Sequence, residues 1–212
     1  VATPSELAVY SISEELQFPP QGAVLQFSTL GDFSDAMTMS NAQYANGVST
    51  LRWSSFYSPP THYRPSSIFN PASNIIGGHW SNGYNAGKAS NGQRYLVPGY
   101  IGDWFVFTTP ACFSMTSMKF TPRATNLDRL PGLFVIYARN SDGDPWTPVH
   151  TQTTKVNTDI IPVHLGGICY LQYGIVVNEL MGTLPAGTLN FLNWKIMGNY
   201  HYQRTTISEE LQ

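Results

Sequence analysis

Runs of β-forming residues separated by turn-forming residues fill the second half of the sequence and limit its fold to β classes. At one junction, Asn140-Ser141-Asp142-Gly143 separates the aliphatic and aromatic run 133–139 from the run that begins at Trp146. Asp-Gly favours a tight hairpin, because both residues tolerate the backbone angles that such a turn needs. The expected strands are 103–108, 113–121, 133–139, 146–153, 158–164, 169–177 and 189–199. Short strands at this spacing predict an all-β fold, an antiparallel β-sandwich of the jelly-roll type.

The first half of the sequence is less regular. Residues 11–17 are compatible with a helix that Phe18-Pro19-Pro20 would end, and 23–27 read as a strand. The polar stretch 28–46 predicts loops and an edge element, and 44–53 predicts a turn that enters a strand. Residues 58–99 are rich in Pro, Gly, Asn, Ser and Tyr, which predicts long loops. The expected organisation is an arm or linker at 1–20, one β-sandwich domain at 21–204 and a C-terminal linker at 205–212.

The composition excludes several classes of partner. Charged residues make up only 11% of the chain, against about 25% in typical proteins. The net charge of -2 and the lack of a basic run argue against binding to nucleic acid. No apolar stretch approaches the ~20 residues of a membrane-spanning helix, so no membrane insertion is expected. The chain begins at Val1 without a signal-like segment, so we expect a processed product or an excerpt. The low charge favours a virion or another extracellular surface.

The two cysteines, Cys112 and Cys169, lie in apolar, strand-like runs. Their spacing is too wide for a typical metal-binding motif. The first interpretation is a pair of buried free thiols, and the alternative is a disulfide that joins two strands.

One hexapeptide occurs twice. Ile12-Ser13-Glu14-Glu15-Leu16-Gln17 recurs without change at 207–212, whereas the flanking residues differ. The repeat could mark a tandem array whose next unit begins at the C-terminus, two linker copies that flank the domain, or a processing signal that ends in Leu-Gln. A duplication at the boundaries of the chain with no role is the remaining alternative.

A series of short segments resembles a known family. In chain order they are Phe18-Pro19-Pro20, Tyr44-Ala45-Asn46-Gly47-Val48, Ser54-Ser55-Phe56-Tyr57, Ile68-Phe69-Asn70-Pro71, Trp80-Ser81, Gly102-Asp103-Trp104, Thr121-Pro122-Arg123, Arg129-Leu130-Pro131 and Asn140–Trp146. Together they resemble the discoidin-like (coagulation factor 5/8 C-type, galactose-binding-like) domains. The most similar variants are the repeats in surface proteins of large DNA viruses of algae. The resemblance implies a β-sandwich that binds ligands through its loops and rarely catalyses a reaction.

The resemblance also bears on metal binding. Family members that hold calcium often carry an acidic residue near the position of Asn70-Pro71. Asparagine keeps one oxygen but lacks the charge, and calcium usually needs carboxylates among six to eight oxygen ligands. The expectation is therefore no cofactor and no metal, with calcium as the less favoured alternative.

Motifs for catalysis are missing from the sequence. The five histidines form no metal-binding helix motif, and there is no Gly-x-Ser-x-Gly elbow or phosphate-binding loop. A pair of carboxylates could still meet in space, as in a glycosidase, but we expect no enzyme activity. Trp104 and Trp194 lie in alternating strands and are expected in the core.

The candidate binding residues are aromatic, amide and cationic side chains in the long loops and the segments that flank them. They are Tyr57, Tyr63, Arg64, Trp80, Asn82, Tyr84 and Arg94. Flat rings and hydrogen-bond donors suit sugar hydroxyls or a partner protein. The alternative is that these segments only cover one end of the sandwich.

The function expected from these observations is a non-enzymatic surface module, in a virion or fibre, that attaches to a cell-surface glycan or protein. The alternative is a structural subunit of a capsid or extracellular filament, whose partners would be copies of itself or neighbouring repeats.

Overall fold

The computed structural model describes residues 9–56, 64–70, 77–80, 83–89, 95–124, 126–155, 159–185 and 187–204, with side chains described from 11 to 202 within these ranges.

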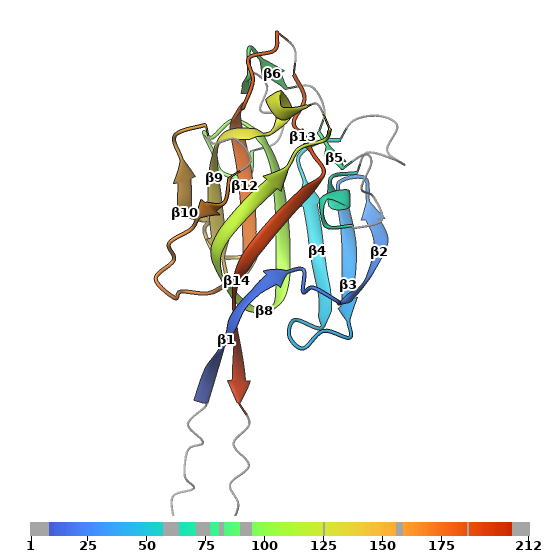
Figure 1. The fold of residues 1–212 in the computed structure, drawn as a ribbon, viewed down its shortest axis with the longest axis vertical. Coiled ribbons are helices and arrows are strands. Elements are labelled where there is room, and N and C mark those ends of the chain that lie inside the picture. The colour runs from blue at the N-terminus through green and yellow to red at the C-terminus, as the bar shows by residue number, and fades with distance from the viewer. Residues whose placement is uncertain are drawn as a thin grey trace, which may run out of the picture.

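The described residues form two layers of antiparallel strands (Figure 1). The larger layer has the order β10 (Thr147–Gln152), β9 (Pro131–Arg139), β12 (Tyr170–Leu180), β8 (Asp103–Thr121), β4 (Gly47–Trp53), β3 (Ser34–Ser40) and β2 (Val24–Gly31). The smaller layer contains β1 (Val9–Phe18), β14 (Asn193–Arg204), the second half of β8 and β11 (Ile161–Pro162). The short pieces are β5 (Gly78–His79), β6 (Tyr84–Asn85), β7 (Lys88–Ala89), β13 (Asn190–Phe191) and the 3-10 helices η1 (Pro65–Phe69) and η3 (Leu127–Arg129).

Strand β8 belongs to both layers. Its first part, 103–108, lies between β12 and β4, and its second part, 112–121, pairs with β14. The two strands expected at 103–108 and 113–121 are therefore one continuous strand that turns the corner between the layers. Pro110 lies at this corner and is not among the β8 residues that pair with β12 or β4. Its missing N–H therefore removes no hydrogen bond from either pairing.

An aromatic core fills the space between the layers. Trp194 is 1% exposed, and its ring lies 5.6 Å from that of Phe107 and 5.7 Å from that of Phe120. Along β14, Trp194 and Ile196 point inward while Lys195 between them is exposed, as the two-residue period of a strand requires. Large aromatic rings dominate the energetics of a protein core, so the abundance of aromatic residues in the sequence is consistent with this sandwich.

The predicted fold class is confirmed: the protein is an antiparallel β-sandwich, and the only helices in the described ranges are the two short 3-10 helices. The Asp142-Gly143 turn joins the neighbouring strands β9 and β10, as expected.

One expectation for the first half was wrong, and a second was right only in part, because β2 does lie at the edge of the larger layer. Residues 11–17 form part of strand β1 instead of a helix, because pairing with β14 and burial of the adjacent Phe18 outweigh local propensity. The stretch 28–46, expected as loops and an edge element, contains most of the β2–β3 hairpin. Met37 and Met39 of β3 are buried, and β3 lies between β2 and β4.

The cysteines are also corrected: Cys112 and Cys169 form a disulfide, with their Cα atoms 5.4 Å apart. The antiparallel pairing of β8 with β12 places both cysteines beside the Phe113–Tyr170 pair, next to a shift in the register of these strands. This pairing joins positions far apart in the sequence, so local patterns did not indicate it.

Candidate functional site

Arg64, one of the predicted ligand contacts, is held inside the protein. Its guanidinium donates to both carboxylate oxygens of Asp35, at 2.7 and 3.2 Å, and to the Gly31 and Ser34 carbonyls at 2.6 and 3.1 Å. The same group lies 4.9 Å from the ring centroid of Trp53. These contacts use Arg64 to tie η1 to β3, so its role here is structural.

Trp80 and Tyr84 are core residues, which corrects their assignment as ligand-stacking rings. Trp80 is fully buried, its ring stacks on Phe191 at 5.2 Å, and its Nε1–H donates to the Trp104 carbonyl at 3.2 Å. Tyr84 is 3% exposed, and its hydroxyl donates to the Val177 carbonyl at 2.8 Å. The other predicted contacts, Tyr57, Tyr63, Asn82 and Arg94, lie outside the described residues.

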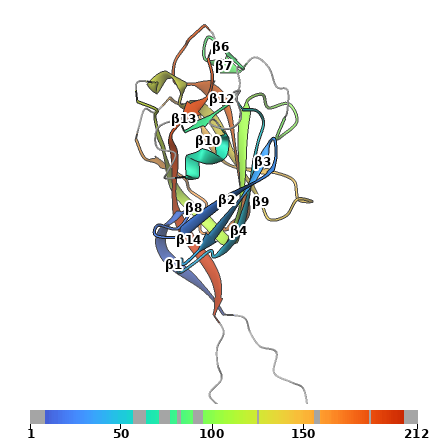
Figure 2. The same cartoon turned by 90° about the vertical axis from the view of Figure 1, so that its right-hand side faces the viewer.

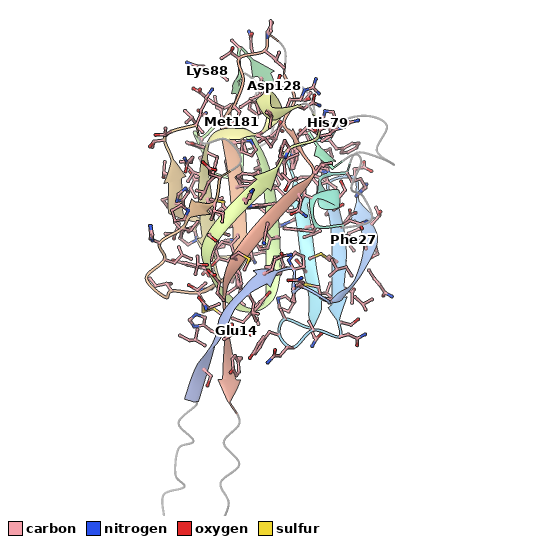
Figure 3. All side chains as sticks on the ribbon, viewed as in Figure 1. Glu14, Phe27, His79, Lys88, Asp128 and Met181 are labelled. Carbon is pink, nitrogen blue, oxygen red and sulfur yellow. A yellow bond between two sulfur atoms is a disulfide. The ribbon has the colours of Figure 1, made fainter. Side chains whose placement is uncertain are left out.

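Two titratable groups with opposite pKa shifts lie at this end of the sandwich. The Asp103 carboxylate accepts hydrogen bonds from the Ser54 and Ser55 hydroxyls, each at 2.6 Å, but burial raises its pKa to about 6. His79, labelled in Figure 3, has Nε2 at 2.9 Å from the Thr188 hydroxyl. Burial and the charges of Arg129 and Arg123 lower its pKa to about 4.

These shifts predict a pH effect that Asp103→Asn should reveal. Since the folded pKa of Asp103 lies above its ordinary 3.8, its contribution to stability is complete below about pH 4 and is lost as the pH rises through 6. His79, depressed from 6.5, has the opposite effect: its contribution is lost as the pH falls through 4. The substitution keeps an acceptor for the two serines, so we expect a gain of up to about 3 kcal/mol at pH 7.

Urea unfolding between pH 4 and pH 7 would measure this effect. The variant should lose stability steadily on acidification, because the contribution of His79 remains and the opposing contribution of Asp103 is gone. A variant with the same pH profile as the wild type would contradict the assignment.

A different part of the surface is hollowed. The turn that begins with Pro19-Pro20 carries the chain from β1 in the smaller layer to β2 in the larger layer, across the flank of the sandwich (Figure 2). Two adjacent depressions lie along this turn, and Gln17, Pro20 and Gln21 line both of them. We call them the paired hollows.

The first, the Tyr44 hollow, has a volume of about 190 Å³. Its lining residues are Glu15, Leu16, Gln17, Pro20, Gln21, Gln43, Tyr44, Lys195, Met197 and Tyr200. The Tyr44 ring is part of a cluster, 5.9 Å from Tyr200 and 5.1 Å from Tyr202. The Gln43 amide donates to the Tyr44 hydroxyl at 3.2 Å. The wall of this hollow therefore combines aromatic rings that neighbouring rings hold in place with the amide groups of glutamine side chains.

The second, the Trp194 hollow, has a volume of about 200 Å³. Its lining residues are Gln17, Pro19, Pro20, Gln21, Gly22, Ala23, Leu25, Phe69, Asn193 and Trp194. The Asn193 amide donates to the Ile68 carbonyl at 3.0 Å, which fixes its orientation. The Trp194 indole nitrogen is buried and meets no hydrogen-bond acceptor among the described residues.

The paired hollows suit a small polar ligand with apolar faces. Each is below the ~300–1,000 Å³ of pockets that enclose drug-sized ligands, so they present a shallow surface for small rings. Amides both donate and accept hydrogen bonds, as sugar hydroxyls require. Sequence reasoning missed this site because its walls come from distant segments. Only Phe18-Pro19-Pro20 and the Tyr44 turn were noted as motifs.

Within the described ranges, no group of three or more His, Cys, Asp or Glu side chains is arranged to hold a metal ion. No helix in those ranges is long and apolar enough to cross a membrane.

Comparison with protein-family models and with curated sequences finds no match. Among solved structures, a family 32 carbohydrate-binding module of Clostridium perfringens NanJ, in complex with galactose, is 15% identical with a TM-score of 0.46, over 70% of this chain and 93% of that one. A chitosan-binding module from a Paenibacillus chitosanase/glucanase is 14% identical with a TM-score of 0.48, over 69% and 92%. A family 32 module from a Clostridium perfringens family 31 glycoside hydrolase is 12% identical with a TM-score of 0.46, over 70% and 90%. At these identities the neighbours assign no ligand and no site residue to this chain.

Proposed function

We propose that the protein is a non-catalytic module that binds glycans through the paired hollows. The observation that carries the proposal is the lining itself, in which the partly exposed Tyr44 ring lies with the amides of Gln17, Gln21 and Gln43 along two hollows that the buried rings of Tyr200 and Trp194 also line. Two adjacent depressions offer places for two neighbouring sugar rings of one oligosaccharide. A partly exposed ring such as that of Tyr44 provides flat apolar contact at low entropic cost, and amides provide orientation.

The proposed setting is an extracellular surface, with a virion or attachment fibre as the specific case. The Cys112–Cys169 disulfide supports an oxidising environment, since structural disulfides are rare in reducing compartments. The low proportion of charged residues and the resemblance to viral surface repeats support the same setting.

A glycan array probed with the full chain tests the proposed function. Variants that remove glutamine side chains of the paired hollows test the location of the binding site. We expect Gln21→Ala and Gln43→Ala each to weaken binding about fivefold, because each removes a hydrogen bond worth about 1 kcal/mol. Both side chains are exposed, so the melting temperature should not change. Gln26→Ala is the matched control, since Gln26 is exposed on β2 and lines neither hollow.

The loop end remains the alternative location for the same function. Binding that survives both amide variants but is lost in Tyr63→Ala would move the site to the segment of Tyr57, Tyr63, Asn82 and Arg94. If no glycan binds and the chain assembles into ordered oligomers, the structural-subunit alternative replaces the proposal. That alternative is favoured by the β1–β14 ribbon, which extends beyond the body of the sandwich (Figure 1).

A further inference from the structure

The first copy of the repeated hexapeptide has a definite structural role. Ile12–Gln17 makes up the second part of β1, which leads from the projecting β1–β14 ribbon toward the buried Phe18 (Figure 1). In the register of this pair, Ile12 lies opposite His201, Glu15 opposite Asn199, and Gln17 opposite Met197.

Residues of the hexapeptide make specific contacts here in addition to the backbone pairing of β1 with β14. The buried Ser13 hydroxyl accepts the Tyr200 N–H at 2.9 Å, and the Asn199 amide donates to the Ser13 carbonyl at 3.0 Å. The Thr116 hydroxyl of β8 donates to the Glu15 carboxylate. Leu16 packs against the core. Three of the six side chains, those of Ser13, Glu15 and Leu16, thus help to hold β1 on β14, on β8 and on the core.

The second copy carries the same recognition residues. Ser208, Glu210 and Leu211 stand where Ser13, Glu15 and Leu16 stand in the first copy. The residues before the two copies differ, Tyr10-Ser11 against Thr205-Thr206. The identity therefore covers the residues whose side chains make these contacts, Ser13, Glu15 and Leu16, and does not extend to the residues before Ile12.

We propose that residues 207–212 of one molecule pair with β14 of a second copy of this chain, in the place that Ile12–Gln17 occupies within a chain. The identical side chains supply the same contacts to β14 and β8. The acceptor could keep its own Phe18, which lies just beyond the exchanged segment and is fully buried.

A second copy is favoured over the molecule's own β14. Pairing in the same register within one chain would turn 202–206 into the connecting loop. That loop would take Tyr202 out of β14 and break the Tyr202–Tyr44 ring contact at 5.1 Å. Exchange between molecules leaves all of β14 intact. Because donor and acceptor surfaces differ, the contact is heterologous and can close into rings or extend into filaments.

Within each molecule, β1 is tethered to the β14 with which it pairs, so its effective concentration there is high. It therefore competes with the segment 207–212 of another molecule. The exchange should therefore increase with protein concentration. It should also increase when the hold of β1 is weakened.

Thiol trapping in the full chain tests the proposed register. Asn199 lies opposite Glu15, so it would lie opposite Glu210 of the partner copy after exchange. We expect the double variant N199C/E210C to form disulfide-linked dimers and larger species whose yield rises with concentration. The matched control E15C/N199C should form the bond within one chain. An N199C/E210C protein that stays monomeric, with free introduced thiols or with a bond inside one chain, would overturn the proposal.

Leucine variants test the competition independently. Leu16→Ala weakens only β1, so we expect more oligomer than in the wild type by light scattering at equal concentration. Leu211→Ala weakens only the incoming segment and should give less. Adding Leu211→Ala to Leu16→Ala should remove the extra oligomer. If oligomer formation is the same with and without Leu211→Ala, the second copy is not the donor, and the proposal fails whether or not glycans bind.

Discussion

Replacing Cys112 and Cys169 together with serine is expected to lower the free energy of unfolding by about 4 kcal/mol. The disulfide closes a loop between positions 57 residues apart, and chain-entropy bookkeeping for a loop of this length gives about that value. The bond joins the corner of β8 to the start of β12, the strand beside β8 in the larger layer. Denaturant unfolding of the variant against the oxidised wild type measures the difference.

The reduced wild-type protein is the natural control for this substitution. Serine is nearly isosteric with a reduced cysteine, so the double variant and the reduced protein should unfold at similar denaturant concentrations. Equal stability of the oxidised and reduced wild type would contradict the expected role of the bond.

Local sequence patterns were sufficient for those strands whose ends are marked by turn residues. The Asp142-Gly143 hairpin is the best case, because both its turn and its flanking alternation lie within a few residues. Residues 11–17 of strand β1 were judged compatible with a helix, because their stability as a strand depends on β14, nearly the whole chain away. The disulfide was only the second interpretation for the same reason: the cysteines meet through the pairing of β8 with β12.

Three of the predicted binding residues were misplaced for a different reason. Trp80, Tyr84 and Arg64 lie in or beside a stretch rich in Pro, Gly and Asn, whose composition indicates exposed loops. In the structure, the two rings are core residues of the short elements that close the end of the sandwich. The paired hollows could not be predicted, because their walls combine residues 15–25 with residues from near positions 43, 69 and 195.

The second large effect is expected from Arg64→Met, because it would leave a buried charge without its partner. The Asp35 side chain is 5% exposed and that of Arg64 is 18% exposed, so water screens their ion pair poorly. The Ser66 hydroxyl would still donate to Asp35, but no cation would remain in the ion pair. Breaking a buried pair on one side costs about 3–5 kcal/mol. We expect a loss of this size in the free energy of unfolding.

The double variant Asp35→Asn/Arg64→Met separates the charge from the packing. It removes both charges and keeps a polar acceptor for Ser66, so it should recover a substantial part of the stability that Arg64→Met loses. Such recovery requires that the uncompensated carboxylate causes the loss. If Arg64 instead contacted a ligand, Arg64→Met would reduce binding and leave the unfolding midpoint unchanged, and the added Asp35→Asn would restore nothing. Chemical denaturation of the three proteins, with glycan binding measured in parallel, decides between a structural and a binding role for this arginine.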